Sequence, residues 1–142
     1  MAKINIFNLC KTIKLPTRKL KSLVRQILNE EKLSYTEINV ILVDDKTIHK
    51  INREFLNHDY PTDVISFDLS DDIPVDDKVA EIYVSVDRAM EQSKFYKVEF
   101  KNEIARLVAH GILHLAGYDD KTRKGKLKMR GRENYYIKKV GF

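Results

Sequence analysis

The sequence has a single cysteine, Cys10, and no long hydrophobic run, and these two absences exclude several classes of protein. One cysteine cannot form an internal disulfide, so the chain is not a disulfide-stabilised secreted domain. The apolar stretches are short, and the run over 38–43 is interrupted by Asn39, which excludes a transmembrane helix. Residues 1–5 alternate polar and apolar side chains and lack the apolar core of a signal peptide. We therefore expect a protein of the reducing cytoplasm that does not enter a membrane.

Glycine and proline are also scarce, with five and three residues, and the chain has neither a repeat nor a low-complexity tract. With 43% hydrophobic and 33% charged residues, the composition is typical of a folded globular protein. A length of 142 residues suits one domain with its own core. We therefore expect a single domain over residues 1–142.

The net charge of +5 is unevenly distributed along the chain. Residues 121–142 include nine basic residues and one acidic residue, a net of +8, so residues 1–120 carry a net of −3. A positive segment on a mildly acidic body favours a polyanion as partner, although a solvated helix face would also explain the charge.

Hydrophobic periodicity predicts an alternation of strands and helices, followed by helices alone. The predicted strands cover 3–8, 37–43, 63–69 and 79–86, and the predicted helices cover 17–32, 46–56, 87–96, 99–116 and part of the basic tail. Loops are expected at 57–62 and 71–77. This order favours an α/β fold of the α+β type, with one mixed four-stranded sheet and about five helices packed on it.

Two local features refine the predicted helices. Asp44 or Asp45 is expected to cap the helix over 46–56, and Asp87 the helix that follows it. Ile48, Ile51 and Phe55 are spaced so that all three should point inward from the first of these helices.

The clearest chemical signal is a pair of histidines, His110 and His114, on the predicted helix 99–116. Histidines four residues apart project from the same side of a helix, one turn apart. Gly117 follows, and glycine readily adopts the left-handed conformation that ends a helix, so the chain can turn back and bring Asp119 or Asp120 toward the imidazoles. This pattern predicts a three-ligand site for a divalent metal with one open position; a pair of core histidines is the alternative.

Two imidazoles and a carboxylate suit one zinc ion per chain, although nickel, manganese or iron(II) would also fit. Zinc metalloproteases carry a glutamate directly after the first histidine as general base, but this chain has Gly111 there, so proteolysis lacks its proton acceptor. Phosphoryl transfer depends mainly on positioning and charge stabilisation, which a metal and cationic side chains provide.

The run HGILHLAGYDD over 110–120, with Met129 and Glu133 beyond it, resembles the YbeY family of bacterial ribosomal RNA maturation factors. NREFLNHDYPTDVISF over 52–67 resembles the second signature of that family, and AEIYVS over 80–85 resembles its G-D-I-x-I-S strand. The resemblance covers most of the chain. It implies a zincin-like fold, a cytoplasmic location, and a single-metal endoribonuclease for single-stranded RNA in small-subunit rRNA maturation and ribosome quality control.

Two positions depart from the family pattern. The third metal-binding histidine of the family falls on Asp120, which can still bind zinc through oxygen, while Asp119 matches the family aspartate and is expected to support the turn or the outer shell. The family also has a functional arginine in the linker before P-T, and this position is Leu56 here. Arg53 lies one helical turn earlier and is the candidate for reaching the same space.

The leading hypothesis is a zinc-dependent endoribonuclease that binds metal through His110, His114 and Asp120. Water or a substrate 2′-OH activated by the metal would attack the phosphodiester. In the basic tail, Arg123, Lys124 and Lys128 are the candidates for holding the RNA backbone. The implied partners are rRNA and the small ribosomal subunit.

Two alternatives remain open. One is a ribosome-assembly binding protein whose metal is structural or vestigial, which the departures at Leu56 and Asp120 keep open. The other is a metal-dependent hydrolase of another substrate, including a peptide, against which Gly111 counts.

Overall fold

A mixed four-stranded sheet lies at the centre of the fold. The computed structural model describes residues 2–58, 62–70 and 77–142. The elements along the chain are β1 (Lys3–Asn8), α1 (Thr17–Glu30), β2 (Glu37–Val43), α2 (Asp45–Leu56), β3 (Val64–Asp68), β4 (Val79–Ser85), α3 (Val86–Tyr96), α4 (Phe100–Leu115) and α5 (Arg123–Val140). The strand order is β1-β2-β4-β3; β2 is parallel to β1 and β4, and β3 is antiparallel to β4.

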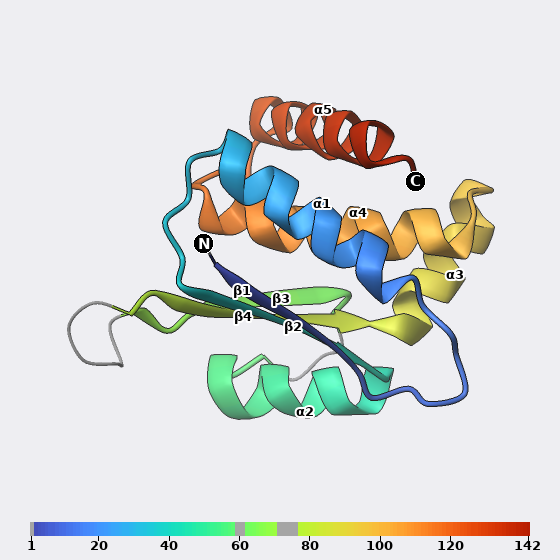
Figure 1. The fold of residues 1–142 in the computed structure, drawn as a ribbon. Helices are drawn as coiled ribbons and strands as arrows, with labels where there is room; N and C mark the ends of the chain where they lie inside the picture. Colours follow the sequence, from blue (N-terminus) through green and yellow to red (C-terminus); the bar gives the residue numbers. More distant parts are fainter. Residues whose placement is uncertain (1, 59–61, 71–76) are drawn as a thin grey trace.

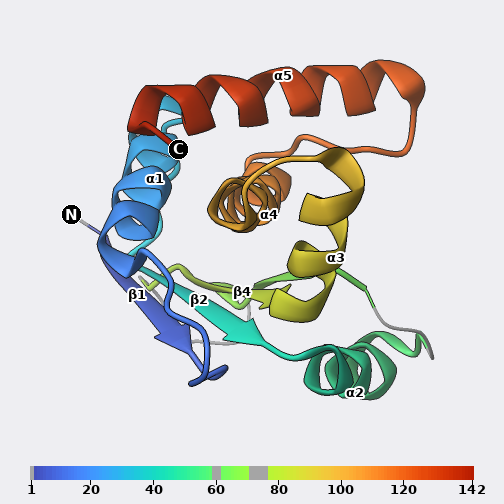
Figure 2. The same cartoon turned by 90° about the vertical axis from the view of Figure 1, so that its right-hand side faces the viewer.

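Helices cover both faces of the sheet. α1, α3 and α4 lie on one face and α2 lies on the other (Figure 1). α5 packs across the outside of α1 and α4, so that α4 lies between the sheet and α5 (Figure 2). Within the described residues, these four strands and five helices confirm the predicted α+β fold. No helix in this described part of the chain combines the length and apolar character needed to cross a bilayer.

The central strand β2 shows how the sequence produces two cores. Its sequence EINVILV is almost entirely apolar, as expected of a strand with parallel neighbours on both sides and helices on both faces. Ile38, Val40 and Leu42 belong to the core under α1 and α4, while Ile41 and Val43 belong to the smaller core under α2. Successive side chains of a strand point to opposite faces, so one strand supplies both cores.

The prediction that Phe55 points inward is wrong. Its side chain is 68% exposed, whereas Ile48 on the same helix is fully buried. Phe55 lies near the end of α2, and its ring makes an edge-to-face contact with Phe67 of β3, with the ring centroids 6.1 Å apart. The small core under α2 therefore does not include Phe55. The predicted loops 57–62 and 71–77 fall partly outside the described residues, which leave out 59–61 and 71–76.

The prediction that Asp87 caps α3 is also wrong. Ser85 is the N-cap residue, and its hydroxyl accepts the Arg88 N–H at 3.1 Å. The helix begins immediately after β4, earlier than predicted, so Asp87 falls within the first turn. There its carboxylate accepts the N–H of Asp45, the first residue of α2, at 2.7 Å. The predicted cap at Asp44 is confirmed, since its carboxylate accepts the Thr47 N–H at 2.8 Å.

The carboxylate of Glu31, just after α1, fastens α5 to the rest of the fold. It accepts hydrogen bonds from Arg132 at 2.9 Å, from the Tyr118 hydroxyl at 3.0 Å and from the Tyr136 hydroxyl. Burial acts to raise the pKa of Glu31, but these three donors together outweigh it and hold the pKa below its usual value. A partly buried carboxylate with three donors is therefore a structural contact between α1, α5 and the loop after α4.

We predict that Glu31→Gln lowers the free energy of unfolding by about 1.5–3 kcal/mol at pH 7, since it weakens hydrogen bonds to a charged group. Because the folded-state pKa of Glu31 is depressed, its contribution is complete above the ordinary value of 4.5 and is lost as the pH falls through the lower folded value. Urea titrations between pH 7 and pH 3 should therefore show the two stability curves converging in acid. Glu30→Gln is the matched control, with a smaller effect because Glu30 is more exposed.

Candidate metal centre

The end of α4 turns the chain back toward the helix. Gly117 has a φ of +97°, and the N–H groups of Gly117 and Tyr118 donate to the carbonyls of His114 and Leu113, each at 3.1 Å. This is the Schellman arrangement, whose left-handed position glycine occupies without a steric penalty. The turn predicted at Gly117 is confirmed, and the residues after it bring Asp120 beside His114.

His110, His114 and Asp120 form a compact cluster of possible ligand atoms that lie within 4.8 Å of one another. The two Nε2 atoms are 3.1 Å apart, and carboxylate oxygens of Asp120 lie 3.5 Å from His110 Nε2 and 3.9 Å from His114 Nε2. Donors bound at about 2.0–2.1 Å to a tetrahedral ion are roughly 3.3 Å apart, so the spacing fits one small divalent ion. The side chains are 22%, 35% and 43% exposed, so the cluster opens to solvent.

Glu133 on α5 orients the first histidine. The Nδ1–H of His110 donates to Glu133 Oε2 at 2.7 Å, and the guanidinium of Arg106 donates to Glu133 Oε1 at 3.2 Å. With Nδ1 engaged, the Nε2 atom of His110 is left to face the cluster. A carboxylate on the far nitrogen of a histidine ligand is a common feature of protein metal sites, where it fixes ring orientation and tautomer.

The two imidazoles have pKa values shifted in opposite directions. Burial alone would lower the pKa of His110, but the hydrogen bond and charge of Glu133, with the charge of Asp120, raise it overall. Burial and the neighbouring His110 lower the pKa of His114, which Asp120 only partly offsets. Two cations 3.1 Å apart would repel strongly, so the cluster favours at most one protonated imidazole. One metal ion bound by both Nε2 atoms would also avoid this repulsion, because both imidazoles are then neutral.

A hollow of about 550 Å³ opens beside the cluster, between α2, β3 and the end of α4. Leu56, at the position where the family resemblance predicts an arginine, lines this hollow, and so does His58. Arg53 is exposed on α2 and does not line it. The wall where the resemblance predicts an arginine therefore carries an aliphatic side chain. That Arg53 reaches this space in its place stays a prediction.

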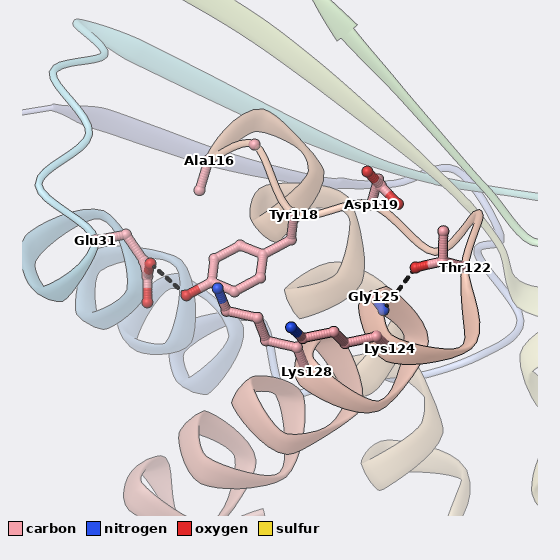
Figure 3. A pocket seen from close by; sticks show the side chains of 9 residues that line it. Glu31, Ala116, Tyr118, Asp119, Thr122, Lys124, Gly125 and Lys128 are labelled. Carbon is pink, nitrogen blue, oxygen red and sulfur yellow. Dashed lines mark hydrogen bonds between the residues drawn. The ribbon is translucent and has the colours of Figure 1, made fainter.

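Two of the basic residues predicted to hold RNA line a different hollow. Lys124 and Lys128 border a space of about 500 Å³ with Tyr118 and Glu31, on α5 and the loop after α4 (Figure 3). Lys128 Nζ lies 5.6 Å from the centre of the Tyr118 ring, whose hydroxyl donates to Glu31. Arg123 is exposed at the start of α5. These cations neighbour the turn that carries Asp120, but Lys124 and Lys128 line a separate hollow from the histidines.

Close packing explains why the residue after the first histidine, Gly111, has no side chain. A Cβ atom built at this position would lie 2.6 Å from Ile82 Cγ2 and 3.3 Å from Val64 Cγ2. The Gly111 carbonyl also accepts the Ser66 hydroxyl at 2.9 Å, so α4 is held tightly against β3 and β4 here. There is no room for the glutamate of the zinc metalloprotease motif, which supports the exclusion of that mechanism on packing grounds.

The structure adds Glu133 and Arg106 to the residues that the metal pattern identified. The family resemblance pointed to Glu133, whereas no motif in the sequence pointed to Arg106. Their signal is weak in sequence, because the His110–Glu133 contact joins residues 23 positions apart on two helices. The one local sign in the sequence is that Glu133 is the single acidic residue in the basic segment 121–142. The structure shows that it is only 5% exposed, which is rare for a glutamate without a partner.

The fold and the cluster define an α+β protein with a histidine–carboxylate site suited to one metal ion. The family model described as Endoribonuclease YbeY matches residues 5–141, and the chain belongs to this family. It is 41% identical over 118 residues to the endoribonuclease YbeY of Chlorobium limicola, covering 83% of this chain and 80% of that protein. It is 45% identical over 112 residues to that of Flavobacterium johnsoniae, covering 78% and 77%. The solution structure of TM1509 from Thermotoga maritima is similar, with a TM-score of 0.65, 31% identity, and coverage of 99% and 89%.

We predict that Gly111→Ala destabilises the protein by about 1–3 kcal/mol, because the added methyl group must displace the buried Ile82. Gly131→Ala is the matched control: Gly131 lies on the exposed side of α5, with nothing within 4 Å of an added Cβ. That substitution should stabilise the protein by about 0.5–1 kcal/mol, the usual gain from replacing a helical glycine. Urea unfolding measures both, and equal effects of the same sign would contradict the packing argument.

Proposed function

We propose that this chain is a metal-dependent endoribonuclease that cleaves single-stranded RNA in the cytoplasm, and that its substrate is small-subunit rRNA during maturation and quality control. The observation that carries the proposal is the cluster of His110, His114 and Asp120 at an open hollow, in a chain of the YbeY family. The curated relatives are named endoribonucleases, which supports RNA as the substrate.

In this proposal His110 and His114 hold one divalent ion through Nε2, and Asp120 holds it through its carboxylate. Two nitrogens and one oxygen favour zinc, with nickel as the next candidate. When bound, the ion supplies Lewis acidity and positive charge toward a phosphodiester.

The side chains around the cluster orient the ligand His110 and form the walls of the hollow beside it. Glu133 holds the Nδ1 proton of His110, so that Nε2 keeps its lone pair for a ligand. The hollow of about 550 Å³ is in the size range of small-molecule sites, so a nucleotide fits beside the cluster. Its wall between Leu56 and Leu115 is partly apolar, which suits the face of a base better than a phosphate.

We predict that metal-depleted protein takes up one divalent ion per chain, measured by calorimetry and elemental mass spectrometry. His114→Ala and Asp120→Ala should each weaken binding by more than the roughly 10–100-fold that loss of an outer partner costs, and Glu133→Gln should fall within that range. Asp119→Ala is the matched control: its carboxylate accepts the Lys121 N–H instead of facing the cluster. Normal metal uptake by Asp120→Ala, together with loss of uptake in Asp119→Ala, would show that Asp119 is the ligand and that the assignment of Asp120 is wrong.

We predict that the metal-loaded protein cleaves unstructured rRNA fragments and that a chelator abolishes the cleavage. His114→Ala should lower the rate by at least the roughly 100-fold typical of losing one electrostatic catalytic group. Cleavage followed on denaturing gels, with Asp119→Ala as the control for loss of a nearby charge, measures the effect. Equal RNA decay with and without chelator would contradict metal dependence.

One observation favours a second candidate, a ribosome-assembly protein that binds RNA without cutting it. Leu56 stands in the wall of the hollow where the family resemblance places an arginine. The same experiment separates the candidates, because this protein would bind rRNA fragments with wild-type affinity in the His114→Ala variant and would leave them intact in every form.

A further inference from the structure

A second, smaller hollow connects the metal cluster to one side of α5. It has a volume of about 200 Å³ and is bordered by two candidate ligands, by Glu133 and by three further residues of α5. The lining residues are His110, Asp120, Lys126, Met129, Arg130 and Glu133. Two cations that the sequence analysis did not single out, Lys126 and Arg130, therefore share a hollow with the cluster.

Arg130 continues this side of α5 toward the end of α3. Its guanidinium lies 5.9 Å from the centre of the Tyr96 ring, and the Tyr96 and Phe95 rings meet edge to face with their centres 5.1 Å apart. The two aromatic side chains are 52% and 79% exposed. Two adjacent exposed rings offer flat apolar faces on which an unpaired base can stack.

Positive charge surrounds these rings. Lys94 and Lys97 flank Phe95 and Tyr96 directly in the sequence, and both are exposed. Within the described residues, no carboxylate lies within ion-pairing distance of Lys126 or Arg130, whereas Arg132 and Lys139 of the same helix are paired with Glu31 and Glu30. Cations that form no ion pair with a carboxylate in the described part of the chain, next to exposed rings, suit a ligand with phosphates and flat bases.

We propose that Lys126, Arg130, Tyr96 and Phe95 form a binding strip for single-stranded RNA that extends from the metal cluster across α5 to the end of α3. The inference rests on the proposed function and extends it. Lys126 and Arg130 contact phosphates next to the cluster, and the rings of Tyr96 and Phe95 stack on unpaired bases further along the strand. Stacking of this kind requires bases that are not paired, so the strip selects single-stranded RNA.

The geometry of α5 separates this strip from the cations near Tyr118. An α-helix advances about 100° per residue, so Lys126 lies roughly 200° from Lys124 around the helix axis. Lys126 and Arg130 border the hollow with His110, whereas Lys124 and Lys128 border the one with Tyr118 and Glu31. RNA held at the cluster meets the first pair directly.

The first test measures the charged part of the strip through binding alone. Fluorescence anisotropy with a labelled, unstructured RNA of about 12 nucleotides compares wild type with Lys126→Ala/Arg130→Ala. Two lost phosphate contacts should reduce the slope of log affinity against log salt by about 1.4. Lys11→Ala/Lys14→Ala, on the exposed loop after β1, removes the same charge elsewhere and should change the slope far less.

The second test measures the aromatic part. Tyr96→Ala and Phe95→Ala should each weaken RNA binding about tenfold, within the range found when a stacking ring is removed, while Tyr96→Phe keeps the ring and should bind as wild type does. All of these side chains are exposed, so thermal melts should be unchanged. In cleavage assays the loss should appear in KM rather than in kcat, because the rings lie away from the reacting phosphate.

The outcomes distinguish this inference from the proposed function. If wild type binds the RNA and the strip variants bind it as tightly as Lys11→Ala/Lys14→Ala does, the proposed strip is wrong, even where cleavage is normal. The same holds if only Lys124→Ala/Lys128→Ala lowers the RNA affinity. If the strip variants lose binding as expected but no form cleaves RNA, the strip stands and the nuclease proposal fails. Unchanged RNA binding in Tyr96→Ala would assign the exposed rings to a protein partner and overturn the inference.

Discussion

The rest of the site depends on the hydrogen bonds that the buried carboxylate of Glu133 accepts from Arg106 and His110. A charged group that is 5% exposed carries a large desolvation cost unless each oxygen has a strong partner, and here Arg106 and His110 supply them. Both partners lie on α4, while Glu133 lies on α5, so the contact positions one helix against the other. The same hydrogen bond sets the tautomer of a candidate ligand. Helix packing and metal-site geometry are thus coupled through one side chain.

The basic side chains of α5 lie on different sides of the helix and make different contacts. Arg132 and Lys139 pair with Glu31 and Glu30 and hold the helix against α1, so part of the +8 charge of the tail is structural. Among the other cations of the helix, Lys124 and Lys128 lie roughly opposite Lys126 and Arg130, and only the latter pair borders the hollow with His110. A net charge counted along the sequence cannot make this distinction, because it depends on which side of the helix faces His110.

The sequence predicted those parts of the fold and site that are local. Strand alternation, the four-residue spacing of His110 and His114, and the helix-ending conformation of Gly117 each depend on neighbours within one or two turns, and all three appear in the structure. What failed was set by tertiary packing. Phe55 has an inward spacing but lies outside the small core under α2, and Asp87 is displaced from the cap because α3 starts directly after β4. The choice between Asp119 and Asp120, and the link from His110 to Glu133, depend on how the loop after α4 lies between two helices.

The packing of α4 on the sheet also limits the chemistry that the histidine pair can support. At position 111 the helix approaches Ile82 so closely that even a methyl group collides, so a general base cannot be placed beside the first histidine without moving the helix that carries both. A peptide bond needs such a base at hydrogen-bond distance from the attacking water. A phosphodiester needs mainly positive charge and alignment, and RNA carries its own nucleophile in the 2′-OH. The close packing that removes the glutamate therefore counts against peptide hydrolysis and leaves phosphoryl transfer open, which agrees with the family to which the chain belongs.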